Sequence, residues 1–452
     1  MKIFLEKAIF INRAPFTELR LDFHENEIAV LSAINGGGKT TFLSHLVDAF
    51  HEIAKHHYQD FSEKTNQFYR LTGGNYTIDK NKPSFVYFRF KHHETNIDYI
   101  DIIGECTKER YDSTIIIENK IQFNDFRNSL ETIGSVKFSP IISNTKIIQE
   151  LFSGNILTYF PSYRHETPGY LNEPYNIKTN FSKHIRFANY LHNKIEVLST
   201  LPSVINWILD CALDQLAYNE STKVFANLDK IITKTLISKG YVDLRFGIGQ
   251  RHVSSARLVI KHNQEIIYPY LFNLSAGESS LLCLFGEILR QADNIKANCQ
   301  LSEITGIVLI DEVDKHLHIK LQKEALPELF LLFPNIQFIV SSHSPFLSMG
   351  LAENENASIR SRIIDLDNNG ISKDIYVNSQ YIEVYEMMIS ENNRFKEEFE
   401  KIKGVIEKSS IPLIITEGKT DIIHLRNAKN KLGINDLEVE FFSFVLGTHE
   451  LD

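Results

Sequence analysis

A glycine-rich stretch near the start of the chain has the residues of a phosphate-binding loop. Segment 32–41, SAINGGGKTT, matches the pattern G-x-x-x-x-G-K-[ST], except that Ala33 replaces the first glycine. Backbone N–H groups of such a loop converge on an anion, and the dipole of the following helix adds partial positive charge. We expect Lys39 to reach the β- and γ-phosphates and the Thr40 hydroxyl to bind Mg²⁺. Alanine is tolerated at 33 if its φ stays negative; the alternative is an ordinary glycine-rich turn.

Acidic and polar residues follow two other apolar runs. IVLIDEVD places Asp311 and Glu312 at the C-terminal end of a buried strand, where ligands bind in open α/β sheets. Asp311 is a candidate magnesium ligand, and Glu312 is a candidate to orient or deprotonate an attacking water. IVSSHS ends the next strand with His343, a candidate sensor of the γ-phosphate. Taken singly, each motif is also compatible with an acidic strand end or a structural histidine.

A third motif, NLSAGESS at 273–280, opens a helix with Ser275, Gly277 and Glu278. Serine followed three residues later by glutamate is typical of a helix N-terminus. The segment therefore predicts a second anion site at a helix start, with a merely capped helix as the alternative.

Composition indicates a globular protein with several domains. The 452 residues are 43% hydrophobic and 23% charged, with a net charge of −9 and no basic tract. At roughly 100–200 residues per domain, two to four domains are expected. The four cysteines include no C-x-x-C pair, which favours buried thiols in a reducing compartment. We expect no signal peptide, no membrane span and a cytoplasmic location.

Strand-like and helical runs alternate along the chain, which argues for α/β layers with a mainly parallel sheet. Helices are expected at 40–55, within 180–239 (notably 202–218), at 274–292 and at 321–333. Strands are expected at 2–12, 18–23, 27–33, 84–90, 97–105, 113–118, 242–249, 256–262, 265–272, 306–313, 336–344, 411–416 and 437–445, with a hairpin over 362–377.

The order AINGGGKTT, LSAGE, LIDEVD and SSHS resembles an ABC-type ATPase head of the SMC-like class. It is still more similar to a prokaryotic branch with DE followed by HLH and then FPNIQFIVSSHSPF. The resemblance implies ATP and Mg²⁺ as cofactors. It also implies a homodimer or higher homo-oligomer in which the signature serine, here Ser275, contacts the γ-phosphate held by another subunit. The implied nucleotide contacts are Asn35, Gly36, Gly37, Gly38, Lys39, Thr40, Thr41, Ser275, Gly277, Glu278 and, from INRAPF, Arg13; the catalytic residues are Glu312 and His343; the metal ligands are Thr40 and Asp311.

The chain departs from this family at several positions. His318, in KHLH, stands where SMC proteins carry an aspartate at the dimer contact, and a metal site made by His316 and His318 is a less favoured alternative. Gln122 and Gln149 are both candidates for the family's glutamine loop. Arg164, in YFPSYRHETP, faces either the nucleotide or a partner, or is a buried structural arginine.

The C-terminal segment IPLIITEGKTDIIHL predicts a strand, an acidic turn and a helix. A carboxylate at a strand end beside a glycine suits magnesium-assisted phosphodiester chemistry, with a charged turn capped by Thr420 or Asp421 as the alternative. The segment resembles the start of a TOPRIM domain, whose metal-binding and catalytic glutamate corresponds to Glu417. An ABC-type head followed by TOPRIM resembles the OLD (overcoming lysogenisation defect) nucleases, some of which are retron-encoded anti-phage effectors. The family's Asp-x-Asp pair, expected after a further helix and strand, does not occur between Glu417 and Asp452, so the resemblance implies a TOPRIM domain that is truncated here or vestigial.

The expected fold class is α/β, an ABC-type P-loop ATPase head with a helical insertion, followed by the start of a TOPRIM domain. The expected domains are an N-terminal lobe at 1–165, a helical insertion or dimerisation region at 166–245, a C-terminal lobe at 246–377, a linker at 378–410 and partial TOPRIM at 411–452. The expected function is an ATPase that controls a TOPRIM magnesium-dependent DNA nuclease in anti-phage defence, with nuclease activity if the chain continues. DNA, a retron reverse transcriptase and its msDNA are the expected partners. The alternatives are a nucleotide-gated scaffold and an SMC-like repair ATPase, although the middle segment has no sustained heptads for coiled-coil arms.

Overall fold

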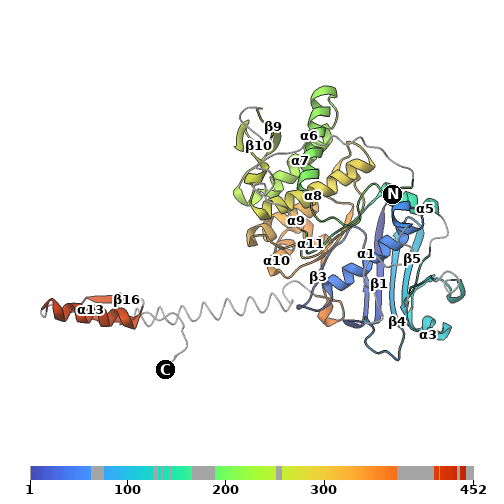
Figure 1. Cartoon of the computed structure of the whole chain (residues 1–452), viewed down its shortest axis with the longest axis horizontal. Helices are drawn as coiled ribbons and strands as arrows, with labels where there is room; N and C mark the ends of the chain where they lie inside the picture. The colour runs from blue at the N-terminus through green and yellow to red at the C-terminus, as the bar shows by residue number, and fades with distance from the viewer. Residues whose placement is uncertain are drawn as a thin grey trace. The chain divides into compact units, whose positions relative to one another are not determined.

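The computed structural model describes residues 2–62, 76–125, 131–133, 136–141, 145–164, 189–250, 257–373, 412–416, 418–434 and 438–443. Contacts divide the chain into two compact units, residues 1–380 and 381–452 (Figure 1). No helix in these ranges combines the length and the apolarity that are needed to cross a membrane.

A six-stranded sheet in the first unit carries the phosphate-loop and acidic motifs. Every neighbouring pair in it is parallel except the pair that involves the edge strand β15. Three of its inner strands, at 28–32, 306–310 and 336–341, are mostly apolar and buried at every position, as expected for a parallel sheet covered on both faces. The predicted, mainly parallel sheet is therefore confirmed. In spatial order the strands are β15 (Ile371–Lys373), β14 (Ser361–Asp365), β3 (Ile28–Ser32), β13 (Ile336–Ser341), β12 (Gly306–Ile310) and β8 (Ile156–Phe160).

The two faces of this sheet are buried in two different cores. Successive side chains of a strand point to opposite faces, so β3 contributes to both. Ile28 and Val30 pack among the apolar residues of helices that lie between residues 201 and 331, whereas Ala29 and Leu31 pack with the helix at 39–55 and a second sheet. The sheet edge that bears the motifs is thus fixed from both sides.

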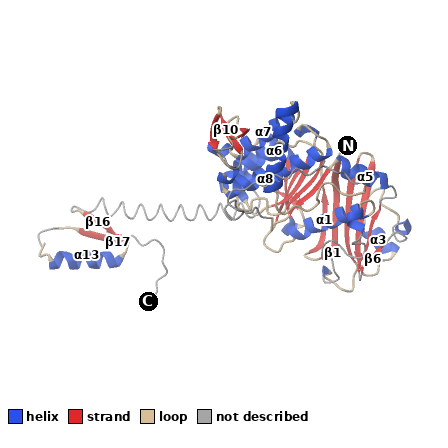
Figure 2. Cartoon of the chain, turned by 45° about the horizontal axis from the view of Figure 1, so that its top comes forward, coloured by secondary structure: helices blue, strands red, loops and turns tan. Residues whose placement is uncertain are grey.

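The second sheet is antiparallel and six-stranded (Figure 2). Helix α1 (Lys39–Lys55) contacts strands of both sheets, and it is buried along most of its length. Two short helices, α2 (Gln59–Ser62) and α5 (Thr145–Gly154), also belong to this half of the unit. The strands of the antiparallel sheet are, in order, β2 (Phe16–Asp22), β1 (Ile3–Arg13), β4 (Ser84–His92), β5 (Thr95–Ile103), β7 (Val136–Ile141) and β6 (Glu131–Ile133).

The prediction of a strand at 113–118 is wrong. The structure instead has helix α3 (Lys108–Thr114) followed by non-repetitive backbone. The buried Arg89 donates to the main-chain oxygens of Glu118 (2.7 Å) and Asn119 (3.2 Å). These hydrogen bonds fix the segment by a side chain from a distant strand, which local β-propensity cannot reveal.

The helical layer on the other face of the parallel sheet confirms the helices predicted at 202–218 and 274–292. The helix predicted at 321–333 begins as a π-helical turn, Leu321–Ala325, before α9. A small antiparallel sheet adjoins this layer and accounts for the strands predicted between 242 and 272. The elements are α6 (Leu201–Tyr218), α7 (Thr222–Thr235), α8 (Ala276–Ile295), α9 (Leu326–Leu331), α10 (Pro345–Glu353), α11 (Glu355–Arg360), β9 (Arg245–Ile248), β10 (Leu258–His262) and β11 (Glu265–Tyr268).

The second unit contains β16 (Leu413–Thr416), α13 (Lys419–Lys431) and β17 (Glu440–Ser443). β16 and β17 are parallel neighbours, as a strand–helix–strand crossover requires. The predicted secondary structure of this segment is confirmed, but Glu417 itself lies outside the described residues.

Candidate nucleotide-binding site

The glycine loop joins the buried strand β3 to the start of α1. Gly36 and Gly38 have φ of 86° and 92°, a region that favours glycine. Ala33 has no positive φ, so it meets the condition on which the sequence prediction depended. The methyl group of Ala33 lies 2.6 Å from where a Cβ on Gly37 would stand. Alanine at the first position is therefore accommodated because position 37 lacks a side chain.

Lys39 is folded against this loop. Its Nζ donates to the main-chain oxygens of Ala33 (2.7 Å) and Ile34 (3.2 Å), and the residue is 6% exposed. Burial lowers the pKa of the ammonium group, while the nearby carboxylates of Asp367 and Asp311 oppose that effect. The loop thus holds a buried cation at the point where the sequence predicts phosphate contacts.

Thr40 and Asp311, the two predicted magnesium ligands, meet at the sheet edge. The Thr40 hydroxyl donates to Oδ2 of Asp311 at 2.9 Å, and Ser341 donates to Oδ1 at 2.6 Å. Two oxygen ligands at right angles, each about 2.1 Å from Mg²⁺, lie about 3.0 Å apart. The two oxygens have the chemistry and the spacing of adjacent ligands in that geometry.

Glu312 follows with an unusual backbone conformation. Its φ is 48°, in the left-handed region, which costs an ordinary residue of order 1 kcal/mol. Ser341 Oγ accepts from its N–H at 2.7 Å. Such strain persists only where surrounding contacts fix it, and it is often found at functional sites. Here the fixed backbone sets the direction in which the half-buried Glu312 side chain projects from the end of β12.

Arg164 supplies the other contacts that fix this turn. Its guanidinium donates to the main-chain oxygens of Asp311 (2.5 Å), Glu312 (2.8 Å) and Pro161 (3.0 Å). Burial lowers its pKa, while the carboxylates of Asp311 and Glu312 oppose that effect. Of the roles that the sequence left open, the structure favours the structural one: a half-buried arginine that holds the backbone of the acidic pair.

The signature segment forms the capped start of α8. Ser275 Oγ accepts from the N–H of Glu278 (3.3 Å), and the Glu278 carboxylate accepts from the N–H of Ser275 (2.8 Å), a complete capping box. Glu278 also pairs with Lys239 at 2.7 Å. A Cβ on Gly277 would lie 2.9 Å from the carbonyl oxygen of His316, so glycine permits close packing against the segment after β12. Ser275 itself is exposed.

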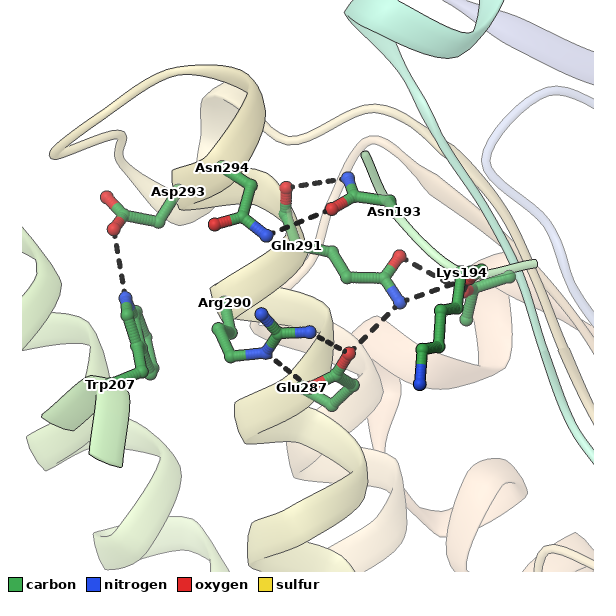
Figure 3. A network of polar contacts seen from close by, with 9 residues as sticks. Asn193, Lys194, Trp207, Glu287, Arg290, Gln291, Asp293 and Asn294 are labelled. Atoms are coloured by element: carbon green, nitrogen blue, oxygen red, sulfur yellow. Dashed lines mark hydrogen bonds and ion pairs between the residues drawn. The ribbon is translucent and has the colours of Figure 1, made fainter. Parts of the chain in front are cut away.

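A buried polar network fixes α8 against the edge strand β8 (Figure 3). Gln291 accepts from the Thr158 hydroxyl at 3.0 Å and donates to the carboxylate of Glu287 at 3.1 Å. Its amide also donates to the carbonyl oxygen of Lys194, and Glu287 pairs with Arg290 at 2.7 Å. A buried network of this kind favours one helix position over its neighbours. The network thereby also fixes the position of Ser275 at the start of the helix.

The structure does not support the nucleotide contact that the sequence predicts for Arg13. Its side chain is fully buried and forms a bidentate pair with Asp101 at 2.5 and 3.2 Å. Its Nε donates to Ser84 at 2.7 Å. The guanidinium is therefore committed to the antiparallel sheet, and the neighbouring residues Pro15 and Phe16 pack against Gly38 instead.

The remaining predicted residues lie near the same sheet edge. His343 is half-buried and follows β13 by two residues, while Asn35 is exposed in the loop and Thr41 lies in the first turn of α1. In the described ranges no three His, Cys, Asp or Glu side chains form a metal site, so His316 and His318 are not completed by a third ligand of these types. His318 instead accepts from the N–H of Lys320 within its own turn.

Two contributors escaped the sequence analysis. Ser341, which contacts both acidic residues, belongs to the SSHS motif and could have been found there. Asp367 follows β14, and its carboxylate accepts from the N–H of Ile34 at 2.7 Å. No local pattern distinguishes this aspartate from an ordinary turn residue.

Comparisons with known proteins point to similar ATPases. Residues 157–349, fewer than half of the chain, match the family model described as "AAA domain, putative AbiEii toxin, Type IV TA system". The chain is 32% identical over 208 residues to the "Retron Vc95 probable ATPase" of Vibrio cholerae serotype O1 biovar El Tor. It is 45% identical over 76 residues to the "Retron Ec83 probable ATPase" of Escherichia coli.

These matches are partial. The first covers 44% of this chain and 38% of the Vibrio protein, and the second covers 17% and 14%. Among solved structures, an SMC head bound to the C-winged helix domain of ScpA covers 82% of this chain and 97% of that chain, with 12% identity and a TM-score of 0.41. The predicted α/β class with a P-loop at the edge of a parallel sheet is confirmed by the sheet itself.

Proposed function

We propose that this protein binds and hydrolyses ATP with magnesium. The observation that carries the proposal is the 2.9 Å contact between Thr40 and Asp311, beside the buried Lys39. It brings a hydroxyl from the loop and a carboxylate from β12 to the spacing of two magnesium ligands. Similarity to two proteins named as retron probable ATPases supports it.

In this proposal the residues at the sheet edge have distinct roles. Lys39 and the loop N–H groups bind the β- and γ-phosphates, and Thr40 and Asp311 hold the magnesium ion, which neutralises phosphate charge. Glu312 takes the proton of the attacking water, and His343 contacts the γ-phosphate. Ser275, exposed at the start of α8, contacts the γ-phosphate held by a second copy of the chain.

The direct test is phosphate release from ATP by the purified protein, with Mg²⁺ and with EDTA. We expect steady turnover that requires the metal and rises more than linearly with protein concentration, because two copies complete each site. Absence of both binding and turnover would contradict the ATPase proposal. Turnover proportional to protein concentration, with a monomer in solution, would contradict the shared site alone.

We expect Arg164→Ala to lower kcat for ATP about tenfold while leaving Kd for ATP within about twofold. The variant loses the donors that hold the main-chain oxygens of Asp311 and Glu312, and hydrogen bonds from a charged group typically contribute about 1.5–3 kcal/mol. Lys39 and the glycine loop keep their own contacts. Phosphate release and equilibrium binding measure the two quantities.

The matched control is Lys315→Ala. The Lys315 ammonium group also donates to a main-chain oxygen of this segment, that of Ser162. Its bond to the acidic pair is made by the main chain, from its N–H to the Glu312 carbonyl oxygen at 3.1 Å, and the substitution retains it. Equal losses in both variants would show that Arg164 acts only through the stability of the segment.

We further propose that the ATPase controls a magnesium-dependent DNA nuclease in anti-phage defence, in the cytoplasm. The support is the parallel strand–helix–strand of the second unit, in which the TEGKTD sequence runs from the end of β16 into the start of α13, and the retron names of the relatives. DNA, a retron reverse transcriptase and its msDNA are the partners that this proposal implies.

We expect Glu417→Ala to remove magnesium-dependent DNA cleavage by the full-length protein, because a catalytic carboxylate ligand is lost. ATP turnover should stay within about twofold of the wild type. Cleavage of plasmid DNA measures the effect, with Glu438→Ala, an exposed carboxylate just before β17, as the control. Unchanged cleavage would place the nuclease site elsewhere, and no cleavage by the wild type would favour the nucleotide-gated scaffold.

A further inference from the structure

The turn after β14 places a carboxylate against the glycine loop. β14 lies beside β3, with Asp365 level with Ser32, so the two strands end at the same sheet edge. Asp365 then holds a tight turn, since its carboxylate accepts from the N–H of Asp367 (3.1 Å) and from the side-chain amide of Asn368 (2.7 Å). The turn carries Asp367 to the exit of the neighbouring strand.

Asp367 holds one peptide unit of the loop through a hydrogen bond. Its Oδ2 accepts from the N–H of Ile34 at 2.7 Å, and its Oδ1 lies 2.7 Å from where a Cβ on Gly37 would stand. The peptide that donates joins Ala33 to Ile34, and its carbonyl oxygen is the acceptor for Lys39 Nζ at 2.7 Å. In a planar trans peptide the N–H and C=O point in opposite directions. Fixing the N–H toward Asp367 therefore fixes the carbonyl toward Lys39.

We propose that Asp367 is a positioning residue for Lys39, acting through the peptide between Ala33 and Ile34. This inference rests on the proposed ATPase function. A peptide held on one side keeps its carbonyl, and hence the lysine amine, in one orientation before ATP arrives. Without the hydrogen bond from Ile34 to Asp367 the peptide can rotate. ATP binding must then include the entropic cost of ordering the peptide again. The site thus depends on a side chain that lies 333 residues after Ile34 along the chain.

The test compares Asp367→Ala, Asp367→Asn and Asn368→Ala by steady-state ATP hydrolysis. We expect Asp367→Ala to raise KM for ATP about tenfold, the usual size of one hydrogen bond to a charged group, with kcat within about twofold. The catalytic side chains on β12 and β13 keep their contacts, so kcat is preserved. Asp367→Asn retains an oxygen acceptor and should restore KM to within about threefold of the wild type. Asn368→Ala loosens the same turn but leaves the acceptor, so its KM should not change.

Several results would overturn the inference while leaving the ATPase proposal intact. They are a wild-type KM in Asp367→Ala, an Asp367→Asn variant as impaired as Asp367→Ala, and an equal rise in KM in Asn368→Ala. A loss of kcat rather than a rise in KM would likewise show a general structural role. Lys39→Ala, measured alongside, separates the two proposals: if it hydrolyses ATP normally, the proposed function itself fails.

Discussion

Lys39→Ala should abolish ATP binding at millimolar nucleotide. The substitution removes the one side-chain ammonium group of the described loop, 32–41. A buried cation that bonds to phosphate oxygens contributes about 3 kcal/mol or more, which is over a hundredfold in Kd. The substitution also removes a contact that preorganises the loop, because the main-chain oxygens of Ala33 and Ile34 lose the donor that they share. This second loss weakens ATP binding further. Isothermal titration calorimetry with ATP and Mg²⁺ measures the effect directly.

The control for this variant is Lys146→Ala on α5, which removes an equal charge from a side chain that is 75% exposed. It should bind ATP as the wild type does. Thermal unfolding of both variants shows whether the fold is retained, since removing a partly desolvated lysine should not lower the melting temperature much. ATP binding by Lys39→Ala with an unchanged Kd would contradict the phosphate-loop assignment.

The glycine loop and its strand and helix could be predicted because their signals are local. An apolar run, three glycines and a lysine occupy neighbouring positions, and each has a direct backbone consequence. The same holds for Ser275, since the capping box is encoded within four residues. Even Ala33, the mismatch in the motif, depends on a residue only four positions away, Gly37.

The rest of the site depends on strand order, which the sequence does not encode locally. Ser341 meets Asp311 because β13 lies beside β12, and Asp367 meets the loop because β14 lies beside β3. Arg13 shows the reverse case. A motif resemblance placed it at the nucleotide, but its buried pairing with Asp101, 88 residues away, gives it a structural role.

Glu312→Gln should bind ATP and fail to turn it over. The change replaces a carboxylate by an amide of the same shape, so packing at the end of β12 is preserved. The contacts that hold position 312 use its backbone: Ser341 accepts from its N–H, and Arg164 donates to its carbonyl oxygen. The strained φ of 48° therefore stays in place, and the side chain keeps its direction without the ability to accept a proton. General base catalysis typically contributes about 10²–10⁴-fold, so we expect kcat to fall by at least a hundredfold.

The ATP that Glu312→Gln binds without hydrolysing gives this prediction a second readout. After incubation with ATP and Mg²⁺ and gel filtration, the variant should retain about one ATP per chain and elute as a dimer, because the Ser275 contact forms while the γ-phosphate persists. Glu324→Gln, an exposed carboxylate on the π-helical turn, is the control and should turn over ATP as the wild type does. Normal hydrolysis by Glu312→Gln would move the base elsewhere at this edge. A lost kcat together with lost ATP binding would instead show that Glu312 is needed to shape the site, since an intact Lys39 and Thr40 should bind nucleotide without it.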